Sequence, residues 1–217
     1  NFLVIAYREL RALENDLLAV LHQGQTVTDI AQIARVNVDQ FHGIEIDEWP
    51  ARIAEVAMWL MDHLMNRDLS EKLGQYFARL PLKQAPHILC ANALRADWKD
   101  VLPPKECSYV MGNPPFVGHQ WRTAEQQADM KAIFGDSAKA GKLDYVTCWY
   151  KLAAQYIQAT AIECALVSTN SICQGETVAP LWQLLFEQYG VKINFAHHTF
   201  KWESEARGKA HVSVVIV

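Results

Sequence analysis

Apolar residues along the chain fall into two patterns, long stretches with helical spacing and short uninterrupted runs. Over residues 2–22 apolar side chains recur at steps of three and four, which predicts an amphipathic helix, and a second stretch with this spacing ends near residue 66. Two further helices are predicted over about residues 145–156 and 178–189. The apolar positions of the first two helices are Leu3, Ala6, Leu10, Leu13, Leu17 and Leu21, and then Ile53, Val56, Ala57, Leu60 and Leu64.

The short apolar runs predict strands between these helices. Strands that alternate with helices of this length imply parallel pairing through right-handed crossovers, so the predicted fold class is α/β. The last two strands follow each other closely and are expected to form an antiparallel hairpin, whereas residues 117–143 are expected to be a long, partly mobile connection. The predicted strands cover residues 41–47, 87–91, 108–111, 165–169, 191–197 and 210–217.

Composition and charge narrow the class of protein. With 217 residues, of which 51% are hydrophobic, the chain has enough apolar material for one large domain and is not disordered. No apolar run reaches the length of a membrane span, so no membrane partner is expected. The net charge of −4 requires that any polyanion be held by a local patch or by a segment outside the chain. Five cysteines without a CxxC pair predict reduced, mostly buried thiols in a cytosolic protein, and no metal site.

The most informative motif is Asn113-Pro114-Pro115-Phe116, which directly follows the strand at 108–111. Ligands of open α/β sheets bind at the carboxyl ends of strands, where this motif lies. Two consecutive prolines fix the backbone and remove two amide donors, so nearby carbonyl groups face outward without a local competitor. Asn113 adds a side-chain carbonyl and Phe116 adds an aromatic face. Together these groups suit a planar substrate that carries an exocyclic amine; the alternative is a rigid turn with one exposed phenylalanine.

With this motif the sequence resembles the class I, S-adenosylmethionine-dependent adenine-N6 DNA methyltransferases, in particular the MmeI-like enzymes of restriction-modification systems. Their catalytic motif reads (D/N/S)PP(F/Y/W). Residues 41–47 resemble the family's second motif, residues 90–94 its third and residues 199–217 its closing hairpin. The resemblance implies a Rossmann-like methyltransferase sheet. It also implies that residues 1–217 are a single catalytic-domain fragment, truncated at both ends, without the family's first strand, glycine-rich loop and target-recognition domain.

The same resemblance implies a role for particular residues. Glu45 suits the cofactor ribose, since one carboxylate accepts hydrogen bonds from two adjacent hydroxyls, and Ile46 would pack on the adenine ring. Asn92 would pair with the adenine amine and ring nitrogen, or else stabilise its own turn. The expected cofactor-binding residues are Glu45, Ile46, Asn92, Ala93 and Phe2, and the expected catalytic residues are Asn113, Pro114, Pro115 and Phe116.

The implied reaction is methyl transfer from S-adenosylmethionine to the N6 amine of an adenine flipped out of double-stranded DNA. The expected setting is cytoplasmic, with target-recognition and nuclease domains fused to this domain or associated with it. Two alternatives stay open at this point. One is methylation of another planar amine or amide, such as an RNA base or a protein glutamine. The other is a catalytically silent DNA-binding or scaffolding module.

Overall fold

The computed structural model describes residues 1–23, 33–74, 85–136, 140–202 and 212–217. It divides into two compact units, Asn1–Asp97 and Trp98–Val217. Both combine helices with strands, which confirms the predicted α/β class. Within the described ranges, no helix is long and apolar enough to cross a membrane.

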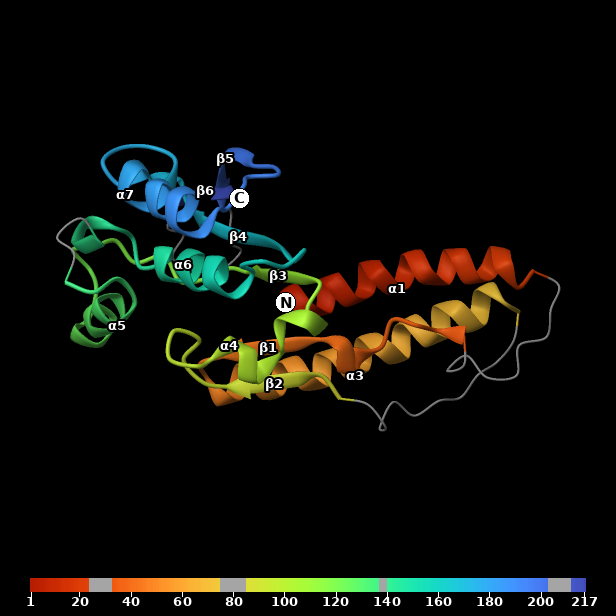
Figure 1. The fold of residues 1–217 in the computed structure, drawn as a ribbon. Helices are drawn as coiled ribbons and strands as arrows, with labels where there is room; N and C mark the ends of the chain where they lie inside the picture. The colour runs from red at the N-terminus through yellow and green to blue at the C-terminus, as the bar shows by residue number, and fades with distance from the viewer. Residues whose placement is uncertain (24–32, 75–84, 137–139, 203–211) are drawn as a thin grey trace. The chain divides into compact units, whose positions relative to one another are not determined.

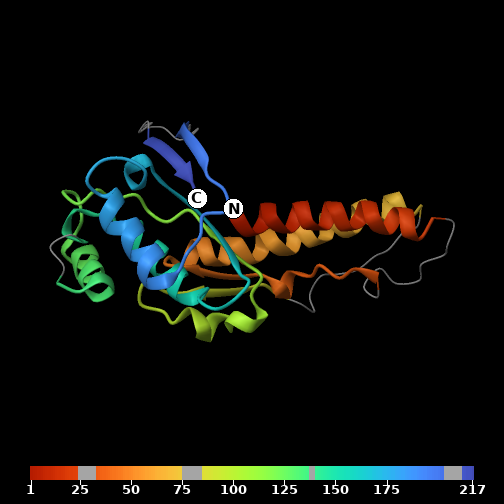
Figure 2. The ribbon, with the colours of Figure 1, turned by 45° about the horizontal axis from the view of Figure 1, so that its top comes forward.

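The first unit pairs two long helices with a short parallel sheet. Helix α1 (Phe2–Leu21) and helix α3 (Glu48–Lys72) lie side by side in both views (Figures 1 and 2). Strand β1 (His42–Glu45) follows a 3-10 turn at Val38–Gln40 and pairs in parallel with β2 (His87–Cys90). All four elements were predicted from the sequence, with α3 extending six residues beyond the expected end.

The two long helices bury a different face from the one that their apolar pattern indicates. Helix α1 buries Tyr7, Arg11, Asn15 and Leu18, whereas the apolar positions Leu10, Leu13, Leu17 and Leu21 are exposed. In α3 the apolar positions Ile53, Val56, Leu60 and Leu64 are likewise exposed. An apolar row normally marks the core-facing side of a helix, so both rows stand out as exposed apolar surface.

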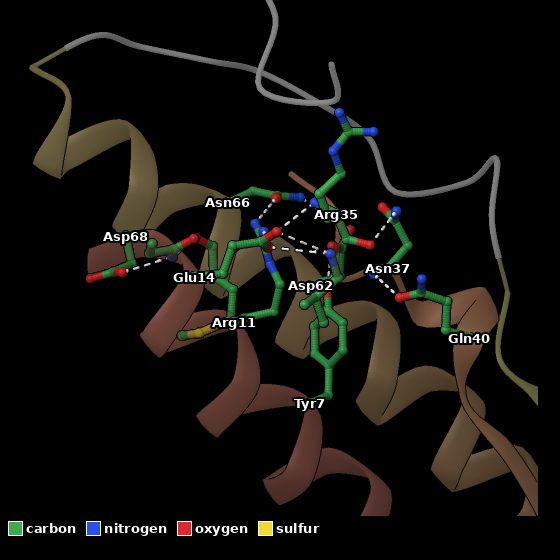
Figure 3. A network of polar contacts seen from close by, with 12 residues as sticks. Tyr7, Arg11, Glu14, Arg35, Asn37, Gln40, Asp62, Asn66 and Asp68 are labelled. Carbon is green, nitrogen blue, oxygen red and sulfur yellow. Dashed lines mark hydrogen bonds and ion pairs between the residues drawn. The ribbon is translucent and has the colours of Figure 1, made fainter. Parts of the chain in front are cut away.

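A network of polar side chains joins α1 and α3 (Figure 3), beside apolar contacts such as that of Leu18 with Leu69. Arg11 is 1% exposed and donates to Glu14 at 2.6 Å and to Asn66 at 2.8 Å. Tyr7 donates to Asp62 at 2.6 Å. The bonds to Asn66 and Asp62 join α1 to α3 and, with the apolar contacts beside them, set how α1 is rotated about its axis.

The second unit contains a four-stranded mixed sheet. Its order is β3-β4-β6-β5; β3 and β4 are parallel and the other two pairs are antiparallel. The antiparallel pairing of β5 with β6 confirms the predicted hairpin, although the charged connection at 203–211 lies outside the described residues. The strands are β3 (Tyr109–Gly112), β4 (Glu163–Thr169), β5 (His197–Trp202) and β6 (Val212–Ile216). The helices are α4 (Trp98–Val101), α5 (Ala124–Phe134), α6 (Thr147–Tyr156) and α7 (Val178–Gln183), which continues as a π-helical turn at Leu184–Gln188.

Three expectations for this part of the chain were wrong. The segment 117–143 contains α5, whose first turn is fixed by a reciprocal capping box between Thr123 and Gln126. The strand expected at 191–197 lies later, at His197–Trp202, because only these residues pair with β6. Of the five free cysteines, Cys148 is buried, while Cys90 and Cys173 are exposed, so the thiols are not mostly buried.

Candidate functional site

Residues 113–116, here called the proline corner, directly follow β3 in the second unit. The corner begins where Gly112, the last residue of β3, pairs in register with Leu166 of β4. Asn113 is exposed, Pro114 is buried and Phe116 is half-buried. Pro115, between them, is exposed. The buried Pro114 therefore anchors the corner, while Asn113 on its outer side is accessible to a substrate.

A buried carboxylate holds the chain directly after the corner. The Val117 amide donates to Asp144 Oδ1 at 3.1 Å, and the Val117 carbonyl accepts from the Tyr145 amide at 3.0 Å. Asp144 Oδ1 also accepts from the Val146 amide, and Oδ2 accepts from the Thr169 hydroxyl at 3.2 Å. One carboxylate thus joins the corner, the chain leading into α6 and the end of β4.

This positioning role of Asp144 was not predicted. The sequence shows Asp144-Tyr145 before a helical pattern, which indicates a helix start and nothing more. The partner, Val117, lies 27 residues earlier in the chain. At the end of β4, the Thr169 hydroxyl contacts both Asp144 and Ser171.

In the first unit, the carboxyl ends of β1 and β2 form a polar edge. The parallel register pairs Glu45 with Cys90, and the Ala91 amide donates to the Glu45 carbonyl at 2.8 Å. Glu45 therefore ends β1, and Asn92 follows the end of the neighbouring strand β2 by two residues, which agrees with the predicted strand-end positions of both. Glu45 Oε1 accepts from its neighbouring backbone amides, at 2.9 Å from Ile46 and 3.4 Å from Asp47. These two bonds orient the carboxylate at the strand end.

The other expected cofactor contacts lie in different settings. The side-chain oxygen of Asn92 accepts from the Leu94 amide at 2.9 Å, so this residue stabilises its own turn. Ala93 is half-buried within that turn, whereas the Ile46 side chain is 62% exposed beside Glu45. Phe2 is the first residue of α1 and is largely exposed. Of the expected cofactor contacts, Glu45, Ile46, Asn92 and Ala93 thus belong to one strand edge, while Phe2 lies on α1.

Comparison with known proteins gives a consistent picture. A curated relative from Bacillus subtilis (strain 168), named DNA methyltransferase A, is 39% identical over 220 residues, which cover 100% of this chain and 25% of the relative. The solved structure of the Type IIL restriction-modification enzyme MmeI in complex with DNA has a TM-score of 0.93 and 57% identity. It matches all of this chain, which covers 29% of that structure's chain. The DNA-bound Type ISP enzyme LlaBIII shares the fold alone, with a TM-score of 0.54 and 16% identity over 97% of this chain and 16% of its own.

This α/β chain, with its proline corner at the end of β3, is thus similar throughout its length to a DNA methyltransferase and to a restriction-modification enzyme. The family model of the MmeI DNA-methyltransferase domain matches residues 1–217, and the chain belongs to this family. The resemblance inferred from the sequence is thereby confirmed. This chain spans only about a quarter of the length of DNA methyltransferase A and of the MmeI chain.

Proposed function

We propose that this domain transfers a methyl group from S-adenosylmethionine to the N6 amine of an adenine flipped out of double-stranded DNA, within a larger modification or restriction-modification protein. The observation that carries the proposal is the proline corner: Asn113 is exposed at the end of β3, and the chain after it is anchored by Asp144. The relatives support the substrate class, because one is named a DNA methyltransferase and MmeI is described in complex with DNA.

The corner fits an amine whose lone pair is delocalised into an aromatic ring. The Asn113 side-chain oxygen and the Pro114 carbonyl would each accept a hydrogen bond from one N–H group of the amine. These two hydrogen bonds favour a more tetrahedral nitrogen. Its lone pair is then available for the transferred methyl group. Phe116, which is half-buried, would stack on the base. The rate enhancement would therefore come from positioning of the amine and from electrostatic stabilisation, and no covalent enzyme intermediate is required.

The polar edge of the first unit fits the nucleoside part of the cofactor. Glu45 offers an oriented carboxylate to two ribose hydroxyls, and the exposed Ile46 beside it offers an apolar surface for a planar base. Asn92 and Ala93 lie in the turn that follows the neighbouring strand β2, and Phe2 is assigned to the same cofactor by the family resemblance. S-adenosylmethionine, when bound, supplies a methyl group on a sulfonium, which is already a good leaving group.

The finer features of the fold and setting belong to the same proposal. The fold would be that of a Rossmann-like methyltransferase domain, with the family's first strand and glycine-rich loop supplied from outside these 217 residues. Residues 1–217 would then be one catalytic domain. Target-recognition and nuclease domains would be fused or associated, and the protein would act in the cytoplasm.

The nature of the methylated product tests this function. The intact protein is incubated with S-adenosylmethionine carrying a labelled methyl group and with double-stranded DNA, and the DNA is digested to nucleosides. The label is expected in N6-methyl-2′-deoxyadenosine. Label found instead in cytosine would contradict the adenine assignment, as would transfer only to RNA or to a protein glutamine when these are supplied in place of DNA. The absence of any transfer by a protein that binds the cofactor would favour a silent module.

A further inference from the structure

The exposed row of apolar residues on α1 has no role in the proposed reaction. We define the leucine stripe as Leu10, Leu13, Leu17 and Val20, whose exposed fractions are 46%, 70%, 57% and 72%. Four large apolar side chains in a continuous row on one helix are unusual for a surface that faces only water. A soluble chain normally covers such a row with another element.

The stripe cannot be buried by a rotation of α1 within the first unit. The opposite part of the helix surface is already fixed against α3 through Arg11, Asn15 and Tyr7. Arg11 is almost fully buried and donates to Asn66 of α3, so turning it toward water would leave Asn66 without this partner. The outward direction of the stripe therefore follows from the polar packing of α1 on α3 (Figure 3).

The spacing of the stripe indicates what kind of element covers it. From Leu3 through Ala6, Leu10, Leu13 and Leu17 to Val20, the steps alternate strictly as three, four, three, four and three. This 3.5-residue repeat is the seam of helices that pack with knobs into holes. The strict alternation of three and four favours another α-helix with the same repeat as the partner.

We propose that the leucine stripe is a docking surface for an apolar helix from the part of the same polypeptide outside residues 1–217. The relatives support this occupant, because the matching region makes up 25% of one and 29% of the other, and most of each chain lies elsewhere. The helix would carry its own apolar residues at steps of three and four. The stripe would then be a contact by which the methyltransferase domain is attached to the rest of the larger protein.

Site-specific photo-crosslinking in the full-length protein tests the proposal. Leu17 is replaced by a diazirine-bearing leucine analogue, which is close in size and shape to leucine and leaves the fold intact. Arg8, exposed on another side of α1, takes the same analogue as a matched control. Protein grown with and without heavy nitrogen is mixed before illumination, so that links within one chain are distinguished from links between two copies.

The expected result is a cross-link from position 17 to a helical segment of the same chain outside residues 1–217, at several times the yield obtained from position 8. Links between light and heavy chains would show that a second copy covers the stripe and would overturn the proposal. Links confined to residues 1–217, or a yield no higher than that of the control, would overturn it as well.

Discussion

The Asp144 carboxylate accepts a hydrogen bond from the Val117 amide at 3.1 Å, directly beyond the proline corner. The same side chain accepts from the Val146 amide and from the Thr169 hydroxyl. Because Asp144 is buried, water does not compete for these donors, and the carboxylate fixes the path of the chain that leaves the corner. Asp144 is thus a positioning residue for Asn113 and Phe116.

Replacing Asp144 by alanine is expected to lower both stability and methyl transfer. It leaves three donors without this acceptor, and each buried donor left unpaired costs about 1–3 kcal/mol. Thr169→Val is the matched control, since it removes only the hydroxyl contact. Unfolding in urea and the initial rate of methyl transfer check the expectation. Full activity of Asp144→Ala would show that the corner is held without this carboxylate.

The proposed ribose contact is tested by cofactor affinity. Glu45→Gln removes the charge from two hydrogen bonds of about 1.5–3 kcal/mol each, so the Kd for S-adenosylmethionine is expected to rise about 10- to 100-fold. Asp47→Asn, two residues later at the start of α3, is the control and is expected to bind nearly as tightly as the unchanged protein. Calorimetric titration measures both. A larger rise in Kd for Asp47→Asn than for Glu45→Gln would show that Asp47, and not Glu45, contacts the ribose.

Burial of two thiols predicts a pH-dependent reactivity. Burial raises the pKa of both Cys148 and Cys164 to about 12, so at pH 8 only about one in ten thousand of these thiols is ionised. Both are expected to react very slowly with iodoacetamide at pH 8 and faster as the pH approaches 12. Peptide mass spectrometry of the native protein, with the urea-unfolded protein as control, measures the rates. Equal rates in the native and unfolded protein would be inconsistent with buried thiols.

The buried arginine between the long helices predicts a large loss of stability. Arg11→Met removes one partner of a buried pair, which costs about 3–5 kcal/mol. Arg8→Met, one turn earlier, removes only a surface pair with Glu9 and is expected to cost less than about 1 kcal/mol. Hydrogen exchange of the α1 amides reports the local stability. Similar protection in both variants would show that the polar interface contributes little.

The elements of the fold were largely predictable, because helical spacing and short apolar runs are local properties of the sequence. The side of a helix that becomes buried is not local. In α1 the apolar row correctly predicted a helix. Which side of that helix is buried depends instead on α3, where Asp62 and Asn66 accept hydrogen bonds from Tyr7 and Arg11. The helix α5 was not predicted, although Thr123 and Gln126 form a capping box. The glycines on either side of it indicated a connection without regular structure.

The candidate site shows the same division. The position of Asn113 at the end of β3 followed from the apolar run and the two prolines, because both signals lie within a few residues of each other. The support from Asp144 and Thr169 did not, since each joins segments about 25 residues or more apart. Such contacts depend on the pairing of β3 with β4, which no local pattern encodes.

Substitution of Asn113 in the intact protein tests whether the proline corner is the catalytic centre. Asn113→Ala removes the side-chain acceptor, whereas Asn113→Asp keeps one and serves as the control. In Asn113→Ala, kcat for DNA methylation is expected to fall at least about 100-fold, as for the loss of a preorganised hydrogen-bonding group, while the Kd for S-adenosylmethionine stays nearly unchanged. Asn113→Asp is expected to retain measurable activity. Undiminished methyl transfer by Asn113→Ala would contradict the assignment of the proline corner as the catalytic centre.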